Sequence, residues 1–323
     1  MQAIRVHGFG GPEVLKLDEL PDPKPGPGQI LMRVNAAGVN PVDTYIRSGK
    51  YAALPKLPYI PGTDAAGTIA ALGDGVANWK IGDRVYCDKP ALGFGSYATH
   101  TICEVNHVHR LPDNVSFAQG AAVNVPYGTA YRALFHRAYP KPGETVLVHG
   151  ATGGVGIAAV QFAFAHGCIV IGTGGSERGR ELVARQGAVH VLDHKSKDYL
   201  DELMKFTNNV GVNVIIEMLA NVNLDNDLKV LAKFGRVVII GNRGRVEIDP
   251  RQTMGKESSI LGMNYWAGGD AAVAEAHHAI VAGLSNSTLR PIVDREYPLA
   301  EAAKAHEDVM GEGSSGKIVL KTD

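Results

Sequence analysis

A short apolar stretch that breaks into closely spaced glycines constrains this chain more than any other feature. Residues 146–148 are an apolar run, a helix-like pattern occupies 157–166, and between them lie Gly150, Gly153, Gly154 and Gly156. A buried strand that enters such a turn and a helix N-terminus can hold a pyrophosphate, because the backbone approaches the phosphates closely and free N–H groups favour negative charge. The spacing departs from G-x-G-x-x-G, so the motif needs support from its surroundings.

Strand-like and helix-like segments alternate after this turn. The strand-like runs are mostly rich in Val and Ile and are predicted at 168–172, 189–192, 212–216, 236–240 and 258–263. The helix-like stretches are predicted at 177–186, 197–207, 224–233 and 270–284. Such alternation is typical of parallel βαβ units. The sequence therefore predicts an α/β, Rossmann-type nucleotide-binding domain with a doubly wound parallel sheet over 123–290.

The N-terminal part has a different pattern. Glycine and proline punctuate short β-like runs at 3–7, 15–19, 30–36, 66–72 and 84–88. This pattern is typical of a compact β-rich domain, either antiparallel or barrel-like. A last strand at 316–320 is expected to pair back into it. The predicted β-rich domain is therefore discontinuous and spans 1–122 and 291–323.

Composition excludes several classes of protein. The net charge of −1 and pI near 6.9 give no electrostatic footprint for nucleic acid or an anionic membrane. No apolar window is long enough to span a bilayer, and the N-terminus does not resemble a signal peptide. Three scattered cysteines exclude a disulfide framework and favour a reducing cytoplasm. Four histidines are interpreted as surface or loop residues rather than metal ligands, namely His107, His109, His277 and His278.

The residues after the second strand bear on which dinucleotide binds. An NAD site tends to carry an acidic residue there, about 20 residues past the glycines. Here glycines and Ser176 leave room for a 2′-phosphate, which Arg178 and Arg180 could neutralise. Glu177 is the counter-argument, since it could accept from a ribose diol, and Arg180 reads more simply as part of a solvated helical turn. On balance the sequence predicts NADPH rather than NADH.

Five motifs lie at 10–15, 38–49, 61–67, 148–156 and 217–224, spread over nearly the whole chain. Together they resemble the quinone oxidoreductase family of the medium-chain dehydrogenase/reductase superfamily, most closely its zeta-crystallin branch. The resemblance implies a GroES-like substrate domain, NADPH use, and a homodimer or homotetramer.

The resemblance also bears on zinc. Zinc alcohol dehydrogenases of this superfamily place a cysteine where this chain has Asn40, and a His-Glu pair where it has Thr63 and Asp64. Without thiolate and imidazole, no tetrahedral zinc site is expected. Because zinc would polarise an alcohol or carbonyl oxygen, the expected substrates are those that accept a hydride readily, namely quinones and carbonyl-conjugated double bonds.

The resemblance places Asn40, Asp43 and Tyr45 beside the nicotinamide. Asn40 and Tyr45 are expected to donate hydrogen bonds to the quinone oxygen or to hold the carboxamide. Tyr59 is expected to line the substrate pocket or relay a proton. Packing between prolines explains Tyr59 equally well, and Asp43 is at least as well explained as a helix cap.

The same resemblance assigns residues to the cofactor. The pyrophosphate is expected at Thr152, Gly153, Gly154, Val155 and Gly156, and the adenosine end at Gly175, Ser176, Arg178 and His194. Nearer the nicotinamide or the strand ends lie Tyr45, Thr129, Asn223, Ile240, Gly241, Asn242, Arg243, Asn264 and Tyr265. His194 is equally well a loop residue, and Thr129 could bond to its own helix. The lysine that some quinone reductases carry in the second turn is replaced here by Gly179.

The predicted reaction is hydride transfer from nicotinamide C4 to an ortho- or para-quinone, without zinc. The alternative enzyme is an NADPH-dependent reductase of conjugated enals or enones. An alternative of another class is a crystallin-like structural protein or an AU-rich RNA-binding protein, but the near-neutral charge and the absence of an aromatic-basic stripe argue against RNA. The sequence does not decide the physiological acceptor, one-electron against two-electron reduction, or dimer against tetramer.

Overall fold

The computed structural model describes residues 1–311, 313 and 315–322. It divides into two compact units, one formed by Met1–Val125 with Ile280–Asp323 and the other by Pro126–Ala279. The first break lies a few residues from the predicted boundary at 122/123. The second lies further from the predicted 290/291, because it falls inside helix α9 (Gly269–Ser285).

The second unit contains a six-stranded sheet in the order β10-β9-β8-β11-β12-β13, and every neighbouring pair is parallel. The strands are β8 (Thr145–Val148), β9 (Ile169–Thr173), β10 (His190–Leu192), β11 (Val212–Glu217), β12 (Leu231–Ile239) and β13 (Ser259–Gly262). The predicted doubly wound fold is confirmed. Its strand order reverses between β8 and β11, and ligands bind such sheets outside the carboxyl ends of the strands at this point.

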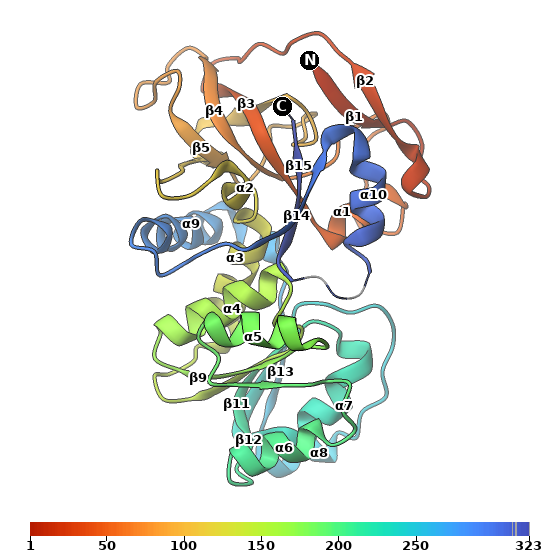
Figure 1. The fold of residues 1–323 in the computed structure, drawn as a ribbon, viewed down its shortest axis with the longest axis vertical. Coiled ribbons are helices and arrows are strands. Elements are labelled where there is room, and N and C mark those ends of the chain that lie inside the picture. Colours follow the sequence, from red (N-terminus) through yellow and green to blue (C-terminus); the bar gives the residue numbers. More distant parts are fainter. Residues whose placement is uncertain (312, 314, 323) are drawn as a thin grey trace. The chain divides into compact units, whose positions relative to one another are not determined.

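Helices cover both faces of this sheet. Figure 1 shows α4 and α5 on one face and α6, α7 and α8 on the other. Their bounds are α4 (Gly154–Ala165), α5 (Glu177–Arg185), α6 (Tyr199–Phe206), α7 (Ala220–Val230) and α8 (Arg251–Lys256). The predicted helix over 224–233 is wrong at its end, because residues 231–233 already belong to β12, where Leu231 pairs with Val212. Helix α3 (Asn124–Tyr131) and a π-helical turn, Arg132–Ala138, precede β8.

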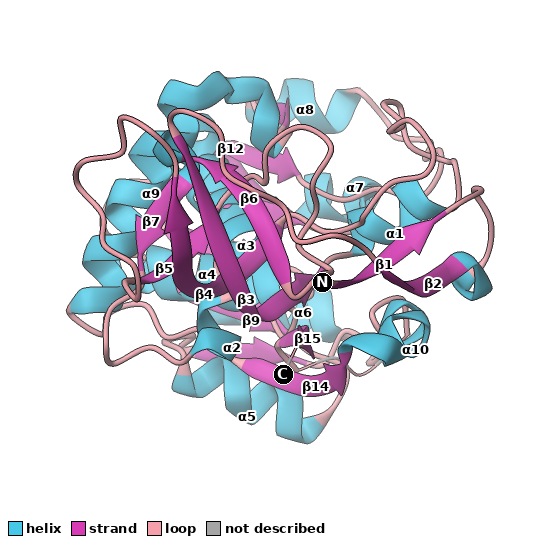
Figure 2. Ribbon diagram, turned by 90° about the horizontal axis from the view of Figure 1, so that it is seen from above, coloured by secondary structure: helices cyan, strands magenta, loops and turns pink. Residues whose placement is uncertain are grey.

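The first unit is β-rich. Its larger sheet has the order β14-β15-β3-β4-β5-β7, with β6 paired to β3, and a hairpin of β1 (Gln2–Val6) and β2 (Leu15–Glu19) lies apart from it. Figure 2 shows β3, β4, β5 and β7 side by side. The sheet strands are β3 (Gln29–Val39), β4 (Asp64–Leu72), β5 (Arg84–Cys87), β6 (His100–Glu104), β7 (Val108–Arg110), β14 (Val293–Pro298) and β15 (Lys317–Lys321).

The C-terminal strand brings distant residues together. β15 runs antiparallel to β3, and Ile318 pairs with Val39. Lys317 therefore lies beside the start of helix α1 (Pro41–Arg47). The remaining helices of this unit are α2 (Phe117–Gly120) and α10 (Ala302–Asp308), and α10 lies next to α1 (Figure 1). Pairing of the two ends of the chain thus builds one polar region in this unit.

Three histidines interpreted as surface or loop residues are instead engaged. Asp88 is buried and pairs with two of them. Its Oδ1 is 2.7 Å from Nδ1 of His107, and its Oδ2 is 2.7 Å from Nε2 of His109. His277 is fully buried, and its Nε2 is 2.9 Å from the hydroxyl of Tyr265. Burial makes a partner necessary for the imidazole of His277, whereas His107 and His109 are only partly buried and pair with a buried carboxylate. Separately, none of the helices among the described residues combines the length and apolarity required to traverse a bilayer.

Candidate functional site

The glycine turn has the conformation that its sequence predicts. Gly150 has φ +55°, and helix α4 begins at Gly154 with Gly153 as its N-cap. A Cβ on Gly156 would lie 2.4 Å from the carbonyl oxygen of Gly150, so only glycine fits there. The turn is tied to the end of β9, since the Gly150 N–H donates to Thr173 Oγ1 at 3.0 Å. The first N–H groups of α4 have no acceptor within the helix and so can receive a phosphate.

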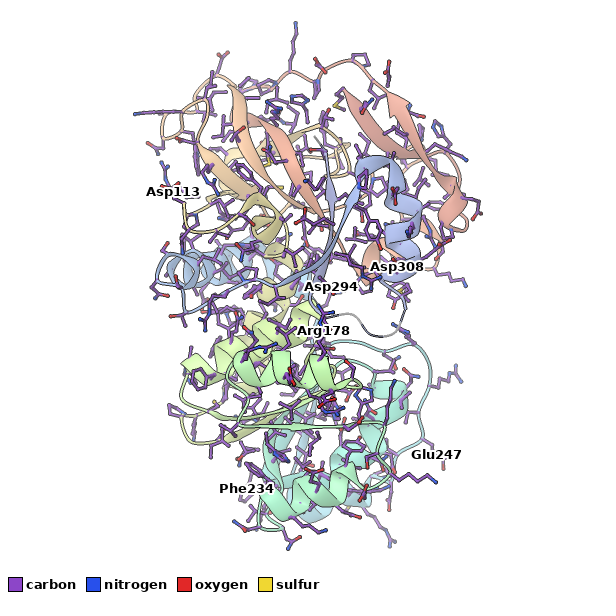
Figure 3. The ribbon with its side chains drawn as sticks, in the orientation of Figure 1. Asp113, Arg178, Phe234, Glu247, Asp294 and Asp308 are labelled. Carbon is purple, nitrogen blue, oxygen red and sulfur yellow. The ribbon has the colours of Figure 1, made fainter. Side chains whose placement is uncertain are left out.

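The segment after β9 forms a second small cradle. A Cβ on Gly175 would lie 2.9 Å from Cε of Lys195 and 3.0 Å from Nε2 of His194. Ser176 caps α5 by accepting from the Gly179 N–H at 3.2 Å. Arg178, exposed in the first turn of α5, is labelled in Figure 3. The structure therefore gathers the predicted Gly175, Ser176 and His194 with a lysine that the sequence analysis missed.

Arg180 does not join this cradle. Its guanidinium donates to Asp193 Oδ2 at 2.8 Å and to the Gly174 carbonyl at 3.4 Å. These bonds hold α5 to the segment after β10. Arg180 is thus a partly exposed side chain held by these bonds, rather than part of a fully solvated turn.

The candidates at the other strand ends have mixed surroundings. The Asn223 amide donates to both oxygens of Glu217, at 3.2 and 3.3 Å. Tyr265 is buried with its hydroxyl on His277, and a Cβ on Gly128 would lie 2.4 Å from its ring. The remaining candidates lie as follows: Ile240, Gly241, Asn242 and Arg243 directly after β12, Asn264 exposed, and Thr129 buried in α3.

In the β-rich unit, Asn40 is part of a buried charged network. The ammonium of Lys317 donates to Asn40 Oδ1 and to Asp64 Oδ2, the latter at 2.9 Å. The Asn40 amide in turn donates to Asp64 Oδ2 at 3.0 Å. Asp64 Oδ1 accepts from the Asn124 amide at 2.9 Å and from the Val125 N–H at 3.1 Å. The Asn40 side chain is therefore fixed, and its Nδ2 keeps one further proton for a substrate.

Asp43 ends a second chain of hydrogen bonds. Its Oδ2 accepts from the Asn40 N–H at 2.8 Å and from the Tyr97 hydroxyl at 3.3 Å. Tyr97 is 3.0 Å from Nε2 of His306, whose Nδ1 is 3.4 Å from the Arg47 guanidinium. Because arginine only donates, Nδ1 of His306 accepts, so Nε2 carries the proton and donates to Tyr97. Each hydrogen bond is therefore donated in the direction of Asp43: Arg47 donates to His306, His306 donates to Tyr97, and Tyr97 donates to Asp43.

Burial sets the protonation of this chain. It raises the pKa of Asp43 to about 7, because it disfavours the carboxylate more than the Asn40 N–H stabilises it. Burial and the charge of Arg47 lower the pKa of His306 to about 3, so this imidazole stays neutral at pH 7. Asp43 does sit in the first turn of α1, where its carboxylate accepts from the N-cap N–H, as the capping interpretation requires.

The two candidate tyrosines differ. The Tyr59 hydroxyl is buried and finds no hydrogen-bond partner among the described residues. Burial together with the charge of Asp43 raises the pKa of Tyr59. A buried hydroxyl without a partner is unusual and suits a group that meets a ligand. Tyr45 is half-buried on α1.

The residues at the expected zinc position do not suit the metal. A tetrahedral zinc needs thiolate or imidazole ligands. Asn40, Thr63 and Asp64 provide neither, and the ammonium of Lys317 already supplies a positive charge to Asp64. The oxygen atoms of Asn40 and Asp64 therefore suit the ammonium of Lys317 rather than a zinc ion.

Two family models match the two parts of the chain. The alcohol dehydrogenase GroES-like domain matches residues 26–113, and the zinc-binding dehydrogenase domain matches residues 154–281. Quinone oxidoreductase of Rattus norvegicus is 49% identical over 322 residues, covering 99% of this chain and 97% of the relative.

Solved structures agree on the fold. Escherichia coli quinone oxidoreductase complexed with NADPH has a TM-score of 0.88 and 30% identity, with 100% of both chains covered. An NAD-dependent alcohol dehydrogenase has a TM-score of 0.93 and 26% identity, again with 100% of both chains covered. Since one fold carries both dinucleotides, cofactor choice must be argued from residues.

The fold and these groups of side chains define a GroES-like plus Rossmann oxidoreductase of the medium-chain dehydrogenase/reductase superfamily. Within that superfamily, the chain belongs to the quinone oxidoreductase family, as the sequence motifs indicate.

Sequence reasoning missed several members of the site. They are Asp64 as an ion-pair partner, Lys317, Asn124, Tyr97, His306, Arg47 and Lys195. Lys317 left only a weak signal, because its strand begins and ends with lysine around three apolar residues. A charge in such a position is rarely buried without a partner.

Proposed function

We propose that this protein is a zinc-independent, NADPH-dependent quinone oxidoreductase that transfers a hydride from nicotinamide C4 to ortho- or para-quinones. The observation that carries the proposal is the buried ion pair of Lys317 and Asp64 with Asn40 between them. It supplies a fixed positive charge where a zinc dehydrogenase would need a metal.

The α/β unit supports the cofactor assignment. The cradle at Gly156 would admit the pyrophosphate against Thr152, Gly153, Gly154 and Val155. The cradle at Gly175, with Ser176 and His194, would receive the ribose 2′-phosphate. Lys195 and Arg178 provide the charges that favour NADPH over NADH there.

The rest of the cofactor assignment extends to the strand ends. We assign the nicotinamide half to Thr129, Asn223, the segment 240–243 and Asn264, with Tyr45 from the β-rich unit. Tyr265 would contribute through its backbone, because its side chain is bonded to His277. When bound, the dinucleotide supplies the hydride.

The side chains of the β-rich unit handle charge and the proton. Asn40 donates a hydrogen bond to the quinone oxygen through its remaining Nδ2–H. Lys317 strengthens that donor by donating its own hydrogen bond to Asn40 Oδ1. The neutral Tyr59 phenol donates a proton to the same oxygen, and Asp43, half protonated near pH 7, replaces it through solvent. One hydride and one proton convert a quinone to a hydroquinone, and Tyr59 supplies that proton.

NADPH and NADH oxidation with 9,10-phenanthrenequinone and 1,4-benzoquinone, in the presence of EDTA, tests the proposal. We expect turnover that favours NADPH and is insensitive to EDTA. Saturated product from an enone, with quinones left untouched, would instead establish the enal and enone reductase. Oxygen consumption from redox cycling would point to one-electron reduction. Loss of turnover with EDTA would overturn zinc independence.

We also propose a cytoplasmic homo-oligomer of the zeta-crystallin type. All three cysteines are buried free thiols, which suits a reducing compartment. Sedimentation equilibrium of the purified protein distinguishes monomer, dimer and tetramer.

A further inference from the structure

A separate group of buried charged side chains lies in the α/β unit, where β8 and β11 end. Nε2 of His149 is 2.8 Å from Oδ1 of Asp227 and 3.6 Å from Oε2 of Glu217. All three side chains are at most 4% exposed. One buried imidazole thus faces two buried carboxyl groups, and within the described part of the chain Asp227 Oδ2 has no hydrogen-bond partner.

The protonation of this group changes close to neutral pH. Burial raises the pKa of Glu217 to about 7, although the charge of His149 opposes this. Burial lowers the pKa of His149, but the hydrogen bond and charge of Asp227 outweigh it and leave the pKa raised. The other groups that face the carboxyls are the Asn223 amide and Tyr199 of α6, whose pKa burial and these charges raise to about 12. The imidazolium of His149 pairs with Asp227, and the carboxyl of Glu217 is left to gain or lose its proton near neutral pH.

Each member belongs to a loop at the carboxyl edge of the sheet. His149 directly precedes Gly150 of the phosphate turn. The Glu217 carboxylate accepts from the Leu219 N–H, and its main-chain carbonyl accepts from the N–H groups of Ile240 and Gly241, at 2.9 and 3.2 Å. The loops after β8, β11 and β12 are thus joined through two residues of the group. These are the loops to which the cofactor is assigned.

We propose that His149, Glu217 and Asp227 are proton-linked positioning residues of the dinucleotide site, and that Glu217 takes up a proton when the anionic cofactor binds. An ionised carboxyl beneath the turn opposes the phosphates, and its protonation relieves that repulsion. The inference rests on the proposed function only in that a dinucleotide must bind at 150–156.

Calorimetric titration of NADPH at pH 7, in buffers of different ionisation enthalpy, counts the protons exchanged. Because the pKa of Glu217 is about 7, the wild type can take up at most roughly half a proton there. Its Kd should rise about three- to fivefold from pH 6.5 to 8. The neutral isostere E217Q should abolish this uptake and flatten the pH dependence. The 2′-phosphate of NADPH itself titrates near pH 6, but this adds the same proton exchange and pH dependence to the wild type and to E217Q.

H190Q provides the matched control. His190 pairs with Glu202 at 2.9 Å in the same unit, but on an exposed face, so its replacement should leave proton uptake as in the wild type. If E217Q retains the wild-type uptake, the inference is overturned while the proposed function stands. If the wild type binds no dinucleotide at all, the proposed function itself is overturned.

D227N keeps the inference testable should E217Q fail to fold. Removal of the Asp227 charge should lower the pKa of Glu217, so the midpoint of the pH dependence should move below pH 7. An unchanged midpoint would contradict the proton linkage. So would stoichiometric metal in the wild type that is lost in D227N, because a cation would then occupy the place of the proton.

Discussion

The ammonium of Lys317 lies 2.9 Å from Oδ2 of Asp64, although 253 residues separate them in the sequence, and both side chains are at most 5% exposed. Because Asn40 bonds to both, the ion pair fixes the side chain that is proposed to meet the quinone. A single contact thus joins the C-terminal strand, the start of β4 and the candidate catalytic residue. A buried pair of this kind is costly to break from one side, since the remaining charge loses its compensation.

K317M should therefore destabilise the protein strongly. We expect the free energy of unfolding to fall by about 3–5 kcal/mol, because Asp64 keeps only neutral donors. The double variant D64N/K317M should recover part of this loss. Urea denaturation of the wild type, D64N, K317M and the double variant measures the coupling.

K321M is the matched control for that experiment. Lys321 lies on the same strand and pairs with Glu296 at 3.8 Å, but the lysine is 49% exposed. Its replacement should change the unfolding free energy by less than about 1 kcal/mol. Equal stability of K317M and K321M would mean that the buried pair contributes nothing to the fold.

Asp43 should make stability depend on pH. Its pKa is about 7 in the folded protein against an ordinary 3.8, so between these values the folded state binds a proton that the unfolded chain lacks. Stability from this group is present below pH 4 and is lost as the pH rises to 7, by on the order of 4 kcal/mol at most. D43N should reduce that slope, as measured by urea unfolding at several pH values. A slope unchanged in D43N would mean that Asp43 is ionised throughout.

Much of the α/β unit follows from local sequence. Each strand is a short apolar run, and the glycine turn needs no distant partner except the end of β9. The helix predicted over 224–233 is wrong at residues 231–233. Their sequence fits a helix, but Leu231 pairs with Val212 of the adjacent strand, and this strand pairing decides the local structure. Whether these residues form a strand depends on the adjacent strand β11, and the helical spacing of apolar residues carries no information about it.

The polar networks could not be predicted in the same way. Asn40 was predicted to meet the quinone or the carboxamide, and Asp64 was considered only for the zinc ligand it replaces. Nothing near either residue in the sequence indicates that Lys317 bonds to both. Asp227 did leave a signal, since it shares the buried side of α7 with Leu224 and Leu228. A charge on an apolar helical face requires a buried partner, but the periodicity does not say that the partner is His149.

K195A should weaken the preference for NADPH. Lys195 lies against the Gly175 cradle, so its removal should raise the Kd for NADPH about tenfold, as expected for one charged phosphate contact. The Kd for NADH, which has no 2′-phosphate, should not change. R180A serves as comparison, because Arg180 is bonded to Asp193 rather than facing the cradle. Fluorescence titration measures both constants, and parallel weakening of NADPH and NADH would show that Lys195 acts on the fold rather than on the phosphate.

Y59F should separate catalysis from stability. The Tyr59 hydroxyl is buried without a partner, so its removal should leave the unfolding free energy unchanged or slightly higher. If this hydroxyl donates a proton to the quinone, kcat should fall at least about tenfold while the Kd for NADPH stays constant. Y51F, a half-buried tyrosine nearby in the sequence, should behave as the wild type. Steady-state kinetics with thermal unfolding measures both effects, and turnover of Y59F within twofold of the wild type would leave Tyr59 with a packing role alone.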